Sequence, residues 1–319
     1  MSLKFGILKE TAQNQNVRVP FSPRKIQLLM EQHPQAQFII ESASNRVFSD
    51  VDYQKLGIEV ATSIVDCDTI IGINPIPSSN LIPNTKYLFV TDVINSDSPL
   101  FTLDSIVGLV GTYNAFRAFG LKFELFKLPY ISSFSDQQEV TTYLKRPVLP
   151  PLKIMVIGTE ELGLGVEVIM KAMKIKKVAV EDFLNKTFAQ AVYTVPDNPT
   201  NADIESLSKV SDISIINSLG NGKSVDLPQS VLNAKDCKLR VVADLSPNST
   251  NSIACTLRQT TLEEPFYGYL PNEGIEVDLF HPAAIVVTAS PDISAEFPKA
   301  ASELIGNQLA QYYLPAFLI

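Results

Sequence analysis

A glycine-rich turn near the middle of the chain has the residue types that bind the phosphates of a dinucleotide. Residues 158–165 read Gly-Thr-Glu-Glu-Leu-Gly-Leu-Gly and follow a predicted strand at 153–157. In such a turn one glycine allows the tight bend, another lets the helix pack closely, and an acid after the next strand holds a ribose. The expected cofactor-binding residues are therefore Gly158, Gly163, Gly165, Glu181 and Asp182.

Glu160 occupies the position at which a dinucleotide-binding turn has its second glycine. At that position the backbone must approach a pyrophosphate, so a carboxylate adds both bulk and negative charge. This charge opposes the attraction that a helix N-terminus exerts on phosphate. Two interpretations remain open: a domain that binds NAD or NADP, and a Rossmann-shaped domain that binds no dinucleotide.

Other groups that could move protons are few. The chain has two histidines, of which His33 is interpreted as a helix-end residue and His281 as a packed or capping residue. Asp92 and Asp292 are a candidate carboxylate pair, which could divide acid and base roles if both faced one cleft. The three cysteines are far apart, so we expect free thiols and no metal site; they are Cys67, Cys237 and Cys255.

The elements that must position these residues alternate between strands and helices. In the first part of the chain, strands are predicted at 4–8, 36–41, 67–73 and 86–91. In the second part, strands are predicted at 153–157, 177–180, 212–217 and 239–244. Helices are predicted at 23–32, 50–56, 104–126, 162–173, 203–209, 227–234 and 296–313. This alternation predicts parallel sheets that are covered on both faces.

The predicted fold class is α/β, with two Rossmann-like domains, each a parallel sheet flanked by helices, and a cleft between them. A substrate-type domain is expected at 1–125, completed by 285–319, and a dinucleotide-binding-type domain at 126–284. The length of 319 residues suits two domains. A net charge of −8 argues against a nucleic-acid partner, and the absence of a long apolar run or signal-like start predicts a cytoplasmic protein with no membrane partner.

Short segments along nearly the whole chain match the motifs of a known superfamily. Residues 6–11 read Gly-Ile-Leu-Lys-Glu-Thr, in which Lys9 and Glu10 are expected to form a solvated salt bridge, and residues 18–23 read Arg-Val-Pro-Phe-Ser-Pro. These segments resemble the alanine dehydrogenase and lysine-forming saccharopine dehydrogenase superfamily, in particular its bacterial saccharopine dehydrogenase-like branch. Further similar segments lie at 48–57, 117–120, 242–246, 267–271 and 280–284.

The resemblance implies roles for individual residues. An arginine in the first loop of these enzymes holds the substrate carboxylate, and Arg18 matches it; a guanidinium suits a planar carboxylate. The position of the catalytic lysine is Asn74, and that of the catalytic histidine is Thr91. Asp292 is adjacent to the position of a late acidic residue, and Asn248 replaces another acid.

These departures support two functional hypotheses. The first is an NAD(P)-dependent amino-acid or opine oxidoreductase that acts on a small amino or keto acid. The second is a catalytically inactive paralogue that serves as a small-carboxylate-binding or partner-binding protein, because neither asparagine nor threonine titrates near neutrality. The oligomeric state is left open, with a homodimer as one alternative.

Overall fold

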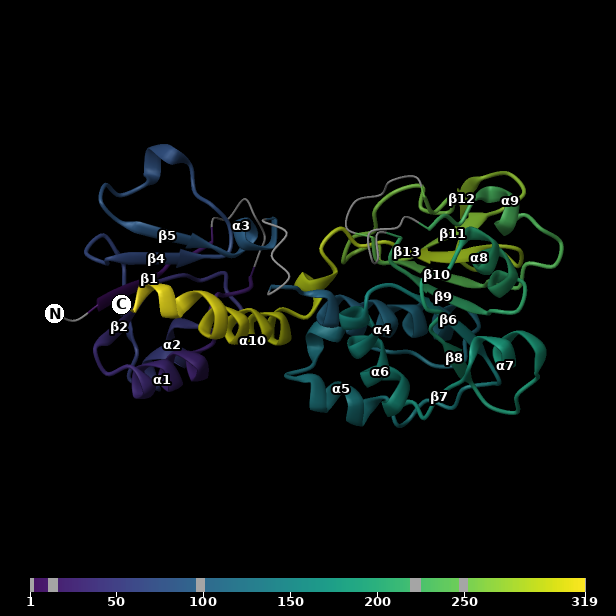
Figure 1. The fold of residues 1–319 in the computed structure, drawn as a ribbon, viewed down its shortest axis with the longest axis horizontal. Helices are drawn as coiled ribbons and strands as arrows, with labels where there is room; N and C mark the ends of the chain where they lie inside the picture. Colours follow the sequence, from purple (N-terminus) through teal and green to yellow (C-terminus); the bar gives the residue numbers. More distant parts are fainter. Residues whose placement is uncertain (1–2, 11–16, 96–100, 219–224, 247–251, 319) are drawn as a thin grey trace. The chain divides into compact units, whose positions relative to one another are not determined.

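The computed structural model describes residues 3–10, 17–95, 101–218, 225–246 and 252–318. The chain divides into two compact units, both of which are drawn in Figure 1. Unit 1 comprises Met1–Leu103 and Phe297–Ile319, and unit 2 comprises Asp104–Glu296. Both units combine strands with helices, and the predicted α/β class is confirmed.

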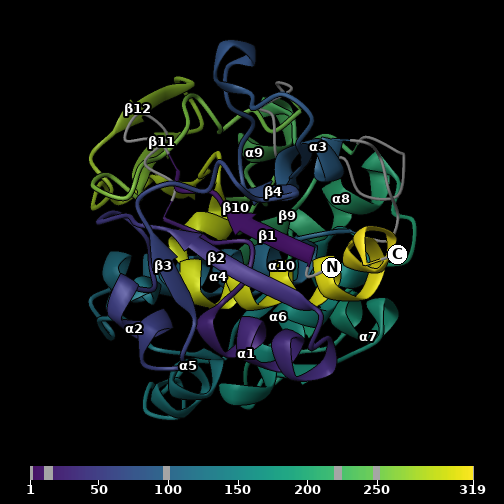
Figure 2. The same cartoon turned by 90° about the vertical axis from the view of Figure 1, so that its left-hand side faces the viewer.

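Unit 1 is built on a five-stranded parallel sheet in the order β3-β2-β1-β4-β5. Figure 2 shows β1 and β2 side by side. The strands are β1 (Leu3–Ile7), β2 (Ala36–Glu41), β3 (Glu59–Ala61), β4 (Thr69–Gly72) and β5 (Lys86–Phe89). Because all of these strands are parallel, the residues that follow β1, β4 and β5 meet at one edge of the sheet.

The helices of unit 1 are α1 (Pro23–Gln32), α2 (Asp50–Gln54), α3 (Val90–Asn95) and α10 (Pro298–Gln308), with short turns η2 (Ser78–Asn80), η6 (Leu309–Tyr313) and η7 (Leu314–Phe317). Helix α1 begins as predicted, with Ser22 accepting a hydrogen bond from the Lys25 backbone N–H and proline at the first position. The α10 helix closes on the first loop, where the Ser302 hydroxyl accepts from the Val19 N–H at 3.0 Å.

Unit 2 contains an eight-stranded sheet in the order β12-β11-β13-β10-β9-β6-β8-β7. Its strands are β6 (Lys153–Ile157), β7 (Lys176–Lys177), β8 (Val192–Thr194), β9 (Ile213–Ile216), β10 (Val241–Asp244), β11 (Tyr267–Leu270), β12 (Ile275–Val277) and β13 (Ile285–Thr288). A parallel sheet was predicted, but this sheet is mixed. Strand β11 pairs antiparallel with both β12 and β13.

The helices of unit 2 are α4 (Asp104–Lys122), α5 (Gln137–Tyr143), α6 (Glu160–Ala172), α7 (Val180–Asn185), α8 (Asn201–Ser208) and α9 (Gln229–Leu232), with turns η3 (Ile131–Ser133) and η5 (Ile293–Glu296). The sequence placed α4 in the first domain, with a boundary after residue 125. In the structure α4 packs along α6 and against the sheet of unit 2, so the division falls before α4.

Two glycines allow α4 and α6 to pack closely. A Cβ atom added at Gly165 would lie 1.8 Å from the Ser105 carbonyl oxygen, and one added at Gly108 would lie 2.1 Å from the Leu162 carbonyl oxygen. Neither distance is sterically possible, so only glycine fits at these two positions.

The α4 helix ends at Lys122, earlier than predicted, and Glu124 has a positive φ of 51°.

Candidate functional site

Three polar side chains form a hydrogen-bonded network at the carboxyl edge of the unit 1 sheet. Glu10 follows β1, Asn74 follows β4, and Thr91 follows β5. The Asn74 side-chain amide donates to Glu10 Oε2 at 2.7 Å, and the Thr91 hydroxyl lies 2.9 Å from Asn74 Oδ1. The structure therefore brings Asn74 and Thr91, which match the lysine and histidine positions of the resemblance, into direct contact.

Glu10 also fixes the backbone around this network. Its Oε1 atom accepts from the N–H groups of Ile73 at 3.0 Å and Asn74 at 3.2 Å. An ionised carboxylate only accepts hydrogen bonds, so the Asn74 amide nitrogen must face Glu10 and the amide oxygen must face Thr91. The predicted salt bridge between the described residues Lys9 and Glu10 does not form. Lys9 Nζ instead pairs with Glu41 Oε1 at 3.2 Å.

The chemistry available to this network is limited. An asparagine amide and a threonine hydroxyl donate and accept hydrogen bonds, but neither changes protonation near neutral pH. Glu10 is engaged by two backbone N–H groups and one amide. The arrangement holds the ends of β1, β4 and β5 together and could orient a polar ligand, and it offers no lysine or histidine to a reacting group.

Arg18 is a buried arginine in the loop that follows β1, with 8% of its surface exposed. Its two neighbours in the chain are held by unit 1: the Val17 carbonyl accepts from the Val47 N–H at 2.8 Å, and the Val19 N–H donates to Ser302 Oγ at 3.0 Å. Burial of a guanidinium is costly unless it is paired with acceptors. The fixed backbone on both sides of Arg18 positions this cation within unit 1.

The two aspartates of the candidate carboxylate pair lie in different units. Asp92 is an exposed residue in the first turn of α3 in unit 1. Asp292 is an exposed residue of unit 2 next to η5, where its Oδ1 accepts from the Ser294 hydroxyl at 3.0 Å. Asn248 lies outside the described residues.

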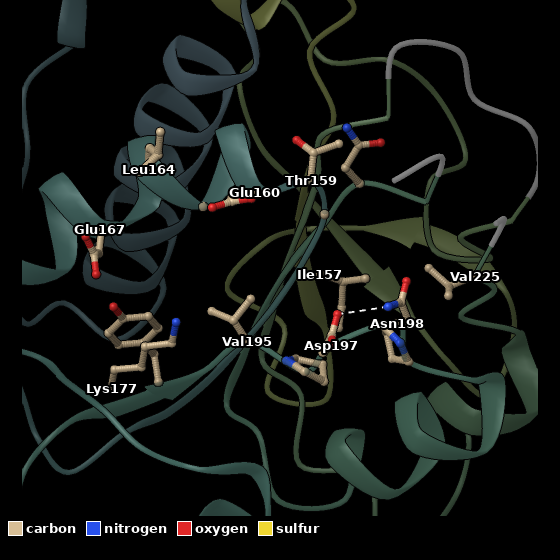
Figure 3. A pocket seen from close by; sticks show the side chains of 16 residues that line it. Ile157, Thr159, Glu160, Leu164, Glu167, Lys177, Val195, Asp197, Asn198 and Val225 are labelled. Carbon is tan, nitrogen blue, oxygen red and sulfur yellow. Dashed lines mark hydrogen bonds between the residues drawn. The ribbon is translucent and has the colours of Figure 1, made fainter. Parts of the chain in front are cut away.

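A cavity of about 450 Å³ lies in unit 2 at the carboxyl ends of β6, β8 and β9. Figure 3 shows Glu160, Leu164 and Glu167 of α6 on one side of it and Asp197 and Asn198 on the other. The volume falls within the range of small-molecule sites. The edge of the cavity includes Gly158 and Gly163 of the predicted dinucleotide-binding turn.

The start of α6 already carries negative charge. Thr159 is the N-cap residue, accepting from the Leu162 N–H, and its hydroxyl donates to Asp104 Oδ2 at 2.7 Å. Glu160 and Glu161 follow in the first helical turn, which is a favourable position for acids beside the helix dipole. Of these two acids, Glu160 lines the cavity.

The three glycines of the turn have different surroundings. A Cβ added at Gly158 would meet the Leu162 side chain at 3.0 Å, whereas one added at Gly163 would have no atom within 4 Å. Gly165 is buried against α4, away from the cavity lining. Gly158 therefore fits the predicted tight turn, Gly163 faces open space at the cavity, and Gly165 serves helix packing.

The predicted ribose-binding acids do not reach this cavity. The expected strand at 177–180 is reduced to the two residues of β7, and Glu181 and Asp182 lie in the first turn of α7, where Asp182 pairs with Lys186 at 2.7 Å. The strand beside β6 is β8, which the sequence analysis did not predict. Asp197 and Asn198 follow β8 and line the cavity. The sequence feature that could have predicted this strand is the short apolar run 191–195 before Pro-Asp-Asn.

The remaining candidate groups are the two histidines and the three cysteines. His33 is the C-cap residue of α1, as predicted. His281 is exposed and not packed, and its Nδ1 accepts a hydrogen bond from the Ala283 backbone N–H at 3.3 Å. The three cysteines are free thiols, and burial raises the pKa of Cys67 to about 11. Such thiols stay protonated near neutrality and are poor nucleophiles.

The described residues contain neither a membrane-spanning helix nor a cluster of metal ligands. Among them, no helix is long and apolar enough to cross a membrane. Over the same residues, no group of three or more histidine, cysteine, aspartate or glutamate side chains is arranged to hold a metal ion.

Comparison with known proteins identifies the fold. No protein-family model matches the chain, and no curated protein matches its sequence. Among solved structures, an L-alanine dehydrogenase superposes with a TM-score of 0.59 at 18% identity, covering 98% of this chain and 91% of the dehydrogenase. A transhydrogenase from Sinorhizobium meliloti gives a TM-score of 0.60 at 15% identity, covering 99% of this chain and 95% of that chain. The chain has the two-domain α/β fold of these proteins.

Proposed function

We propose that the chain is a small-carboxylate-binding protein built on a dehydrogenase-type fold, and that it does not transfer hydride. In this proposal Arg18 holds the carboxylate of an amino or keto acid in unit 1. The observation that carries the proposal is the contact between Thr91 and Asn74, with Glu10 behind Asn74. A hydrogen-bonded amide and hydroxyl occupy the two positions at which the resemblance places a lysine and a histidine.

The chemical reason is the proton balance of the reaction. Interconversion of an amine and an imine, coupled to hydride transfer, requires groups that accept and release protons as charge develops. Asn74 and Thr91 cannot do so near neutral pH, and their mutual hydrogen bond holds both side chains in place. Arg18, by contrast, keeps a charge suited to a carboxylate.

Carboxylate binding is tested by calorimetry with a panel of 2-oxo acids and amino acids on the full-length protein. We expect Arg18→Gln to weaken binding of the best ligand by about tenfold or more, because a charge-assisted pair is lost. The matched control is Arg24→Gln, which removes an exposed arginine from α1. Equal affinity for wild type and a folded Arg18→Gln variant would overturn the role of Arg18.

A second candidate function is supported by the unit 2 cavity. In this alternative the chain is an NAD(P)-dependent amino-acid or opine oxidoreductase of the alanine dehydrogenase and saccharopine dehydrogenase superfamily, with unit 1 binding substrate and unit 2 binding the dinucleotide. The cavity at the strand ends, bordered by Gly158 and Gly163, favours it. Fluorescence titration with NADH and NADPH separates the two: micromolar binding supports the oxidoreductase, and no binding at millimolar cofactor removes it.

A further inference from the structure

The unit 2 cavity lies where the chain changes direction across its sheet. From β8, on one side of β6, the chain passes through α8 to β9 on the other side of β6. In open α/β sheets such a switch point forms a ligand-binding crevice outside the carboxyl ends of the strands. The cavity has this location, and its lining comes from unit 2 alone.

We propose that this cavity binds a ribonucleoside whose 5′ substituent carries no negative charge, and that it disfavours nucleotides with phosphate groups. The inference is independent of the carboxylate site in unit 1. Three observations support it: the negative charges that line the cavity, the position of Asp197 after β8, and the apolar residues of the lining.

The charges of the lining favour a neutral or cationic ligand. Glu160, Glu167 and Asp197 line the cavity together with one lysine, Lys177. A hydrogen bond from Lys171 lowers the pKa of Glu167, so this carboxylate is ionised near neutral pH. A pyrophosphate would add two negative charges to a cavity lined by three carboxylates, and like charges repel.

Glu160 lies at the N-terminus of α6, where a phosphate would otherwise be bound most favourably. The N-terminus of a helix attracts an anion through its unpaired N–H groups and its dipole. In α6 the helix N-terminus attracts the Glu160 carboxylate in place of a ligand anion, because Glu160 is the first helical residue and lines the cavity. Gly163, beside it, leaves open space into which an uncharged 5′ group can fit.

Asp197 is placed to bind the ribose. It follows β8, the strand beside β6, which is where the ribose-binding acid of a dinucleotide fold comes from. The Asn198 side chain donates to Asp197 Oδ1 at 2.9 Å and orients this carboxylate, as Figure 3 shows. A carboxylate has about four acceptor positions, so one such bond leaves room for the two ribose hydroxyls.

The wall between these groups suits a nucleobase. Ile157, Val195, Pro196 and Val225 supply apolar surface, and Tyr193, which is opposite Lys177 in the pairing of β7 with β8, adds an aromatic ring. Small-molecule sites commonly combine an apolar lining with a few convergent polar groups. A flat base on the apolar wall with its ribose at Asp197 would direct the 5′ position toward Glu160.

The direct test is a calorimetric series on the full-length protein in which only the 5′ group changes. Adenosine, guanosine, cytidine and uridine are screened first. The best nucleoside is then compared with its 5′-amino-5′-deoxy derivative, its 5′-monophosphate and its 5′-diphosphate. We expect affinity to fall in the order amine, hydroxyl, monophosphate, diphosphate, with about tenfold or more between hydroxyl and diphosphate. Diphosphate binding as tightly as nucleoside, or no nucleoside binding at millimolar concentration, would overturn the proposal.

Two matched pairs of variants locate the effect. Glu160→Gly should improve diphosphate binding by about tenfold, whereas Glu161→Gly, the same change one residue later and outside the cavity lining, should alter it by less than about twofold. Asp197→Asn should weaken nucleoside binding and remove the preference for ribose over 2′-deoxyribose, whereas Asp182→Asn on α7 should leave both unchanged. Equal effects within either pair would place the ligand elsewhere.

Discussion

The hydroxyl oxygen of Thr91 lies 2.9 Å from the side-chain oxygen of Asn74, so residues that follow two neighbouring strands of unit 1 are joined directly. The Ile73 carbonyl lies at the same distance from this hydroxyl, and Glu10 holds the other end of the Asn74 amide. Three separate segments of the chain therefore meet in one hydrogen-bonded unit. This unit explains why polar, non-titrating residues suit both positions.

The network predicts a measurable contribution of the Thr91 hydroxyl to stability. Thr91→Val keeps the branched shape and removes the donor, which should lower the free energy of unfolding by about 1 kcal/mol. Thr62→Val, at an exposed position of the same unit, should change it by less than about 0.5 kcal/mol. Urea unfolding followed by circular dichroism measures both, and equal midpoints for the two variants would argue against the Thr91 hydrogen bond.

Gly163 and Gly165, two residues apart in α6, should respond oppositely to the same substitution. Gly165→Ala places a methyl group 1.8 Å from the Ser105 carbonyl oxygen and should destabilise unit 2 by about 3 kcal/mol. Gly163→Ala meets no atom within 4 Å and should stabilise the helix by roughly 0.5–1 kcal/mol. Calorimetric melting compares them, and a tolerated Gly165→Ala would mean that α4 and α6 are further apart than described.

Glu296 predicts a pH dependence of the stability of unit 2. Burial raises the pKa of this carboxyl, and the nearby Asp292 adds to the effect, while hydrogen bonds from Asn114 and Ser290 and the charge of Arg117 oppose it. A folded-state pKa above the unfolded value means that the stabilisation is complete at low pH and is lost as pH rises through the folded-state pKa.

Glu296→Gln should remove this loss because glutamine does not titrate. The melting temperature of the variant should exceed that of wild type at pH 8, and the difference should shrink toward pH 5. Glu263→Gln, at an exposed position, is the control and should follow the wild-type curve. A wild type that gains stability relative to Glu296→Gln as the pH rises would reverse the sign and contradict the assignment.

Much of the fold follows from the sequence because its signals are local. The strand at 153–157, the cap at Ser22 and the α/β alternation depend on residues within a few positions of each other, and the structure has all three. The close approach of Gly108 to Leu162, by contrast, joins helices far apart in the sequence.

The features that could not be predicted depend on pairing between distant segments. Strand β8 has only three residues, and its insertion between β6 and β7 is set by hydrogen bonds to both neighbours. Sequence spacing therefore pointed to Glu181 and Asp182, which do not line the cavity, and gave no indication of Asp197, which does. The Glu10–Asn74 bond spans 64 positions in the chain, which no local pattern could show.

Our proposal that the protein does not transfer hydride is tested most directly by following nicotinamide absorbance in the presence of the purified protein. The assay combines NADH or NADPH with 2-oxo acids and either ammonium or amino acids. We expect no protein-dependent oxidation of the cofactor, even with a ligand whose carboxylate binds at Arg18. Turnover that saturates with the oxo acid and falls in Arg18→Gln would contradict it.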